Sequence, residues 1–137
     1  MRVYLDSSAL IKRALLEDES SSLIAAIERY VDASATLLSS TLSWVEVSGS
    51  LRSRLDSEPP AEVADRINVA LSGIVECPIS DEIIGVARRL GGPSTLRSLD
   101  AIHLATATLI GADLVCAYDK RLLTSAAELG FRTISPE

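Results

Sequence analysis

The sequence has few of the residues that bind zinc or pair with a nucleophile. It contains one histidine, His103, and two cysteines, Cys77 and Cys116, with no Cys-x-x-Cys spacing. A zinc site is therefore not expected. With one histidine we also find no plausible base and orienting group for a serine nucleophile. Both cysteines lie in apolar, strand-like runs, so we expect buried free thiols in a reducing compartment.

Aromatic residues are scarce, at 4% of the chain, whereas hydrophobic residues make up 47%. Leu, Ile, Val and Ala must therefore supply the core. The sequence has no linker-like stretch and no internal repeat. Its 137 residues suit a single domain that spans residues 1–137.

Long uninterrupted apolar runs are also missing. The N-terminus reaches Asp6 before the apolar segment of a signal peptide can form. The longest apolar region, residues 101–118, is interrupted by His103, Gly111 and Asp113, and it is typical of a helix, a turn and a strand. We therefore expect a soluble, cytoplasmic protein with no membrane contact.

Positive charge is in the minority. The 13 Lys and Arg residues are outnumbered by 19 Asp and Glu residues, and the formal net charge is −6. Proteins that coat nucleic acid usually carry a basic surface. The overall charge argues against that class, so a contact with nucleic acid would depend on local groups of cations.

Apolar runs with strand character alternate with amphipathic segments along the chain. This alternation predicts an α/β domain with a mainly parallel sheet of four to five strands and helices on both faces. Serines or prolines precede several predicted helices, and glycines follow them. The predicted strands are 3–5, 36–39, 74–79, 114–118 and 132–134, and the predicted helices are 7–16, 20–31, 41–55, 60–71, 81–90, 99–110 and 120–129.

Four of the helix boundaries carry specific signals. Ser80 and Ser98 are expected to cap the helices that follow them. The helix over 81–90 has acids in its first turn and arginines in its last, which matches the helix dipole. Residues 91–93, Gly-Gly-Pro, are expected to end that helix, and Gly111 the one over 99–110.

Two acids directly follow predicted strands, and two more lie within helices. Asp6 follows the first strand and Asp119 the fourth, whereas Glu46 and Asp100 lie in otherwise apolar helical stretches. Functional residues of parallel sheets collect at the carboxyl ends of the strands. Each acid also has an ordinary interpretation: Asp6 and Asp119 as helix N-caps, Asp100 as a partner of the helix dipole, and Glu46 as a solvated residue.

Together the four acids favour a shared site. Carboxylates that are brought together raise one another's pKa values, and a divalent cation relieves the repulsion. Oxygen ligands suit Mg²⁺ or Mn²⁺ rather than zinc. Gly49, one helical turn after Glu46, weakens its helix, so we expect either a close approach of a ligand or a tight helix contact there.

Four segments resemble the PIN-domain ribonucleases in their order and spacing. They are LDSSALIK, the lone glutamate of SWVEV, LRSLDAIHLATA and AYDKRL. The resemblance covers residues 2–134, and a free-standing chain of this size is similar to the VapC-type toxins of toxin–antitoxin pairs. It implies a three-layer α/β/α fold and a metal-dependent endoribonuclease that uses Mg²⁺, with Mn²⁺ as a substitute.

The resemblance also implies the site. The acidic quartet of the family corresponds to Asp6, Glu46, Asp100 and Asp119, and Ser8 matches a hydroxyl residue that is often a site member. We expect Asp6, Asp100 and Asp119 to bind metal and Glu46 to orient or deprotonate the attacking water. Many relatives carry threonine two residues before the last acid, where this chain has Ala117.

The remaining polar residues near the motifs each have two interpretations. His103 is either a general acid or, as we favour, a residue that packs beside the site and makes a structural hydrogen bond. Contacts with RNA are assigned to cations that flank the acids, although each is equally well explained as a solvated surface charge. These cations are Lys12, Arg13, Arg97, Lys120 and Arg121, with Arg52 and Arg54 as further candidates.

The resemblance implies a VapB-like antitoxin partner, a homodimer, and a transfer RNA or ribosomal RNA loop as substrate. A non-catalytic PIN-fold module that binds protein or RNA is the main alternative. A dehalogenase-type phosphatase would need an acid in place of Ser8, and a response-regulator receiver would need one in place of Ser7. The chain lacks the length for the DNA-bending elements of related DNA nucleases.

Overall fold

The computed structural model describes residues 1–90 and 96–137. Five strands form one sheet in the order β3-β2-β1-β4-β5, and every neighbouring pair is parallel. The strands are β1 (Arg2–Leu5), β2 (Thr36–Ser40), β3 (Val75–Cys77), β4 (Leu114–Cys116) and β5 (Arg132–Ile134). The helices are α1 (Ser7–Ala14), α2 (Ser20–Asp32), α3 (Thr41–Arg54), α4 (Pro60–Leu71), α5 (Asp81–Leu90), α6 (Ser98–Leu109) and α7 (Lys120–Glu128).

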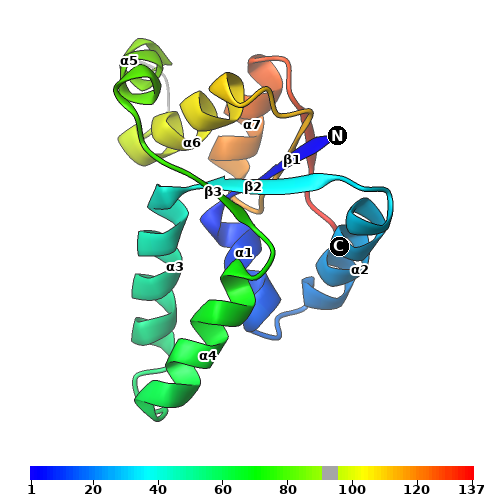
Figure 1. Ribbon diagram of the computed structural model, residues 1–137, viewed down its shortest axis with the longest axis vertical. Coiled ribbons are helices and arrows are strands. Elements are labelled where there is room, and N and C mark those ends of the chain that lie inside the picture. The colour runs from blue at the N-terminus through cyan, green and yellow to red at the C-terminus, as the bar shows by residue number, and fades with distance from the viewer. Residues whose placement is uncertain (91–95) are drawn as a thin grey trace.

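The α/β class and the parallel sheet predicted from the sequence are confirmed. Helices cover both faces of the sheet: α5, α6 and α7 lie on one side of β1 and β2, and α1, α3 and α4 on the other (Figure 1). The alternation of side chains along β1 explains this arrangement. Val3 and Leu5 pack in one apolar cluster with α1 to α4, whereas Tyr4 packs in a second cluster with α6 and α7.

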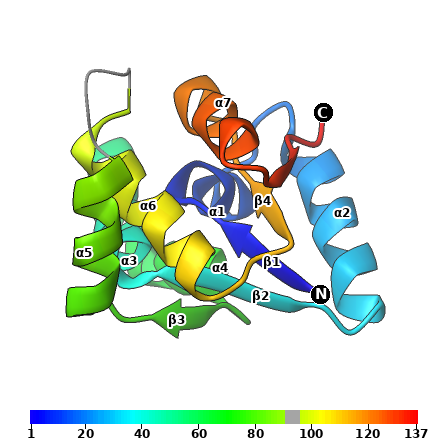
Figure 2. The same ribbon diagram turned by 90° about the horizontal axis from the view of Figure 1, so that it is seen from above.

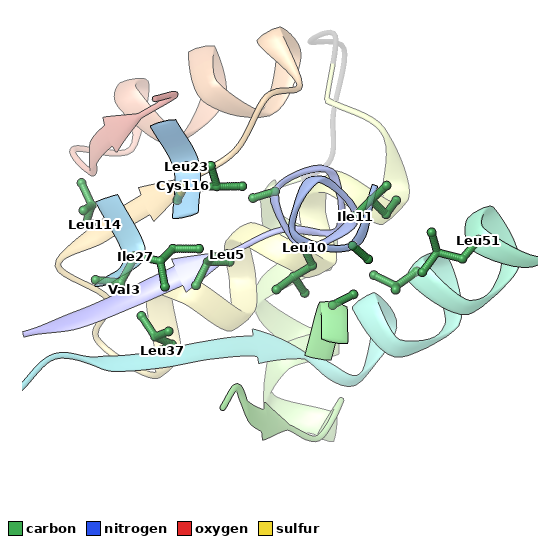
Figure 3. Close-up of a cluster of buried hydrophobic side chains, with 14 residues drawn as sticks. Val3, Leu5, Leu10, Ile11, Leu23, Ile27, Leu37, Leu51, Leu114 and Cys116 are labelled. Atoms are coloured by element: carbon green, nitrogen blue, oxygen red, sulfur yellow. The ribbon is translucent and has the colours of Figure 1, made fainter. Parts of the chain in front are cut away.

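The larger cluster is built from aliphatic side chains, as the composition requires. Figure 3 shows Val3 and Leu5 of β1 beside Leu10 of α1 and Ile27 of α2. Cys77 and Cys116 are both buried free thiols, as expected. Among the described residues, no helix is long and apolar enough to cross a membrane.

The element boundaries differ from the sequence prediction at several ends. Helix α1 ends at Ala14 rather than at 16, and β3 and β4 are shorter than predicted. Ser98 is the first residue of α6, not its cap; the N-cap is Arg97, whose side chain makes no capping hydrogen bond. Gly111 follows α6 with a φ of +66°, a conformation that favours glycine. The predicted stop at residues 91–93 lies outside the described residues.

Of the two explanations offered for Gly49, the tight helix contact is wrong. A Cβ built at Gly49 would meet no described atom within 4 Å. Gly49 is exposed on α3, so neither a tight helix contact nor a close approach within the described chain requires a glycine there.

The strand order places a topological switch at the centre of the sheet. β1 lies between β2 and β4 (Figure 2), so the chain leaves β1 towards one side of the sheet and returns to β4 on the other. Ligand sites in such sheets lie outside the carboxyl ends of the strands at this switch. Asp6 and Asp119 follow β1 and β4 at this position.

Candidate active site

Asp6 and Asp119 both cap the helices that follow them. Oδ1 of Asp6 accepts the backbone N–H of Ala9 at 3.0 Å. Oδ1 of Asp119 accepts the N–H groups of Arg121 and Leu122, at 2.9 and 3.2 Å. Capping therefore occupies Oδ1 of each acid and leaves Oδ2 available for another partner, so a cap and a site residue are compatible roles.

All four acids line one cavity of about 240 Å³. Asp6 and Asp119 come from the ends of the central strands, Glu46 from α3 and Asp100 from the first turn of α6. Asp6 and Asp100 are buried, whereas Glu46 and Asp119 are partly exposed. Ser7, Ser8, Arg97 and His103 also line the cavity. The structure thus brings together the quartet and both residues that the sequence analysis placed beside it.

Ser8 joins Asp6 to the backbone after β4. Its hydroxyl donates to Oδ1 of Asp6 at 2.6 Å and accepts the N–H of Tyr118 at 2.9 Å. Because Tyr118 precedes Asp119, the Ser8 hydroxyl connects the two strand ends that carry the acids. This contact fixes the position of the buried carboxylate.

Arg97 lies between two acids of the quartet. Its Nε donates to Oδ2 of Asp100 at 3.0 Å, and its Nη2 donates to Oδ2 of Asp119 at 2.6 Å. The side chain of Arg97 is 53% exposed, so its guanidinium group sits at the mouth of the cavity. Two of the four acids therefore already face a common cation.

The protonation of the acids follows from these contacts. Burial raises the pKa of Asp6 from 3.8 to about 6, against the opposing hydrogen bonds from Ser8 and Ala9. Burial acts in the same direction on Asp119, but the N–H of Leu122 and the guanidinium of Arg97 outweigh it, and the pKa of Asp119 is lowered. The hydrogen bond to Asp100, together with the one to Asp119, raises the pKa of Arg97.

His103 is buried between a tyrosine and one of the acids. Its Nε2 lies 2.7 Å from Oε1 of Glu46, and its Nδ1 lies 2.6 Å from the hydroxyl of Tyr4. The sequence analysis did not single out Tyr4. The signal for it was its position in β1: the alternation of RVYL turns the tyrosine away from Val3 and Leu5, towards the face that carries α6.

The predicted RNA-binding cations fall into different environments. Arg97 lines the acidic cavity, and Lys120 and Arg121 are exposed in the first turn of α7. Lys12 lines an adjoining hollow and is paired with Glu17 and Glu19, at 2.8 and 2.9 Å. Arg13 instead donates to the backbone carbonyls of Ala70 and Ser72, at the end of α4. Of the further candidates, Arg54 pairs with Glu17.

The donor set of the cavity suits a hard divalent cation, because it consists of carboxylate and hydroxyl oxygens. Within the described part of the chain, however, no three His, Cys, Asp or Glu side chains are grouped tightly enough to enclose a metal ion as they stand. Arg97 is the cation that Asp100 and Asp119 contact instead. The residues therefore fit a metal once Arg97 withdraws.

Comparison with known proteins agrees with the fold. A model of the PIN domain matches residues 3–129. Ribonuclease VapC46 of Mycobacterium tuberculosis is 38% identical over 138 residues, which cover 98% of this chain and 97% of the relative. Ribonuclease VapC47 of the same species is 37% identical over 136 residues, which cover 98% of this chain and 96% of the relative.

Solved structures share the fold at low identity. VapC20 of Mycobacterium tuberculosis, a toxin that cleaves the sarcin–ricin loop, superposes with a TM-score of 0.72 at 13% identity and covers 98% of this chain and 99% of its own. The VapBC2 complex of Rickettsia felis, bound to a DNA fragment from its promoter, gives a TM-score of 0.74 at 10% identity, with 100% of each chain covered.

The parallel sheet, the acids at its carboxyl edge and the family match define a PIN-domain protein, and the chain belongs to this family. The chain is also more than one third identical to two VapC ribonucleases along nearly its whole length, which identifies its group within the family. It is a VapC-type PIN ribonuclease toxin.

Proposed function

We propose that the chain is a divalent-metal-dependent endoribonuclease whose acidic site hydrolyses RNA phosphodiester bonds. The observation that carries this proposal is the shared cavity of Asp6, Glu46, Asp100 and Asp119 at the switch of the sheet. Four carboxylates in one cavity repel one another, and the burial of Asp6 adds to the cost of its charge. A bound cation offsets both effects.

Asp6, Asp100 and Asp119 would hold Mg²⁺, and Mn²⁺ would substitute. When bound, the ion supplies Lewis-acid stabilisation of the phosphate and a more acidic water. Ser8 keeps the Asp6 carboxylate in place. Glu46 either orients the attacking water by accepting a hydrogen bond or removes a proton from it. Arg97 leaves Asp100 and Asp119 and pairs with an RNA phosphate at the mouth of the cavity.

The acidic overall charge is compatible with this activity. The formal net charge is −6, and the four site carboxylates account for four of those charges, so −2 remains outside the site. Lys120 and Arg121, exposed beside Asp119, would add to the phosphate contacts. With few cations involved, the dependence of RNA binding on salt concentration is expected to be weak.

The protein would be a cytoplasmic homodimer, held inactive by a VapB-like antitoxin that covers the acidic cavity. Its substrate would be a structured loop of transfer RNA or ribosomal RNA. Support for the antitoxin comes from the match to toxin–antitoxin complexes, such as one from Klebsiella pneumoniae with a TM-score of 0.66 at 21% identity, covering 98% of each chain. RNA loops expose bases and backbone that duplexes hide.

The test is cleavage of total RNA by purified, antitoxin-free protein in Mg²⁺, in Mn²⁺ and in EDTA. Discrete fragments that require metal are expected from the wild type and are expected to be absent with Asp100→Asn. Asp65→Asn, which removes the same charge from the exposed face of α4, should cleave as the wild type does. Metal-independent cleavage would contradict the proposal. Binding of RNA or antitoxin without metal binding or cleavage would favour the non-catalytic module.

A further inference from the structure

A chain of hydrogen bonds runs from the sheet to the acidic cavity through three side chains. Tyr4 is fully buried in β1, and its hydroxyl lies 2.6 Å from Nδ1 of His103. His103 is 3% exposed, and its Nε2 lies 2.7 Å from Oε1 of Glu46, which is 27% exposed. The chain therefore connects a residue with no access to solvent to an acid at the cavity wall.

The contact with Glu46 requires a hydrogen on Nε2 of His103. A carboxylate only accepts hydrogen bonds, so a bare Nε2 at 2.7 Å would place two acceptors against each other. The ring is therefore either the neutral form that carries its hydrogen on Nε2 or the doubly protonated form.

The contact with Tyr4 decides between these two forms. The Tyr4 oxygen already accepts the N–H of Ser40 at 3.2 Å, so its own hydrogen needs an acceptor. The acceptors near the phenol are Nδ1 of His103 and the oxygen of Ser39, whose own hydrogen goes to the carbonyl of Leu5. The 2.6 Å between the Tyr4 oxygen and Nδ1 of His103 lies within the usual range for an O–H donor and below that for an N–H donor. The phenol therefore donates to Nδ1, which carries no hydrogen of its own.

We propose that Tyr4 locks His103 in the neutral form with its hydrogen on Nε2, and that His103 in turn positions Glu46 for the RNA cleavage reaction. This inference rests on the proposed function for its last step. Tyr4 and His103 are then positioning residues that act through Glu46, comparable to the hydrogen-bonded partners that hold ligands of metal sites. His103 is not a general acid in this account, because Tyr4 and Glu46 engage both of its ring nitrogens.

The lock on Glu46 has a defined geometric consequence. Oε1 of Glu46 is held by His103, so Oε2 is the oxygen that can reach a water or a substrate group in the cavity. The His103 ring cannot turn without breaking its bond to Tyr4 within the buried cluster around β1 and α6. Glu46 extends from α3 and gains an anchor on α6 through this bond.

The state of His103 can be measured directly, because it is the single histidine of the chain. Long-range proton–nitrogen correlation spectra of ¹⁵N-labelled protein distinguish the two neutral forms of the ring from the doubly protonated one. The proposal predicts a protonated Nε2 and an unprotonated Nδ1 at neutral pH, with a slowly exchanging Nε2 hydrogen that shifts in Glu46→Ala. A hydrogen on Nδ1, alone or together with Nε2, would overturn it.

The contribution of Tyr4 to cleavage is tested by removing its phenol oxygen. Tyr4→Phe should lower kcat for cleavage by about tenfold or more, within the range seen for partners of metal-site ligands, with KM nearly unchanged. The same change at Tyr30, on α2 and away from the cavity, is the matched control and should leave kcat unaltered. A folded Tyr4→Phe protein with wild-type kcat would contradict the proposal.

A double variant separates a relay from two independent effects. His103→Gln keeps a donor where Nε2 lies but has no atom that faces Tyr4. If Tyr4 acts through His103, Tyr4→Phe should lower kcat less than twofold in this background; a full additional loss would contradict the relay. A wild type that cleaves no RNA would instead refute the proposed function, and the ring-nitrogen spectra would still decide the lock itself.

Discussion

The guanidinium of Arg97 bridges Asp100 and Asp119, and its bond to Oδ2 of Asp119 is 2.6 Å long. A metal ion that binds these two carboxylates must compete with Arg97. Removing the competitor in Arg97→Gln should therefore tighten Mn²⁺ binding by only about twofold to fivefold, since solvent screens exposed ion pairs and leaves them weak. Calorimetric titration with Mn²⁺ measures this change.

Cleavage by Arg97→Gln is expected to change in the opposite direction. If Arg97 pairs with an RNA phosphate once metal is bound, the variant should bind metal more tightly and cleave more slowly. Arg29→Gln, which removes an exposed arginine from α2, serves as the charge-matched control. Weaker metal binding in Arg97→Gln would show that the arginine supports the metal site rather than competing with it.

The raised pKa of Asp6 predicts how the stability of the metal-free protein depends on pH. Because the folded-state pKa is about 6 and the ordinary value is 3.8, the folded protein binds this proton more tightly than the unfolded chain does. The free energy of unfolding should therefore fall as the pH rises from about 4 to 6, by up to about 3 kcal/mol. Asp6→Asn keeps the capping oxygen and should remove this fall.

Thermal unfolding in EDTA at pH 5 and pH 7.5 checks the prediction for Asp6. The wild type should lose stability relative to Asp6→Asn at the higher pH, and Mg²⁺ should restore it only in the wild type. Metal binding should weaken below about pH 6, because the proton on Asp6 competes with the ion. Equal pH dependence in both proteins would mean that Asp6 is not the responsible group.

Ser8 is expected to matter for both stability and metal binding. Ser8→Ala removes the donor to Asp6 and the acceptor of the Tyr118 N–H, which should lower the free energy of unfolding by about 1–3 kcal/mol. It should also raise the pKa of Asp6 further, because the Ser8 hydrogen bond lowers that pKa. Metal affinity near neutral pH should fall as a result.

The neighbouring serine provides the comparison. Ser7 also lines the cavity, and Ser7→Ala changes the same atom one position earlier in α1. Chemical denaturation and Mn²⁺ titration of the two variants should separate them clearly. Equal effects would mean that the Ser8 contacts add nothing specific to the site.

Gly49 gives a prediction about stability alone. It lies within α3, where a Cβ would meet no described atom within 4 Å. Gly49→Ala should raise the free energy of unfolding by roughly 1 kcal/mol, because alanine favours the helix and restricts the unfolded chain. Chemical denaturation midpoints of the two proteins test this prediction, and RNA cleavage should be unchanged. A loss of stability would show that an unrecognised contact requires the glycine.

Much of this fold was predictable from local sequence patterns. Asp6 directly follows β1 and its side chain caps α1, so strand, acid and helix follow from adjacent residues. Ser98 shows the limit of local signals: a serine before an apolar helix reads as a cap, yet Arg97 holds that position while its side chain bonds Asp100 and Asp119.

The candidate site was predictable as a set of acids but not as a network. Asp6 and Asp119 share a sequence context that places both at strand ends. The Tyr4–His103–Glu46 chain depends instead on how β1, α6 and α3 pack, and these elements are separated by up to 99 residues. The hydrogen bonds of Arg13 to the end of α4 also depend on how the elements pack, and no short sequence motif predicts them.

The central claim is that the acids of the cavity bind a divalent metal that cleavage requires. The most direct test is to titrate Mn²⁺ into metal-free wild type and Asp100→Asn, and to measure RNA cleavage at each point of the titration. The account predicts that wild-type cleavage rises with metal occupancy and that the folded variant shows weakened binding and no cleavage. Saturable metal binding that Asp100→Asn leaves unchanged, or cleavage that does not follow occupancy, would contradict it.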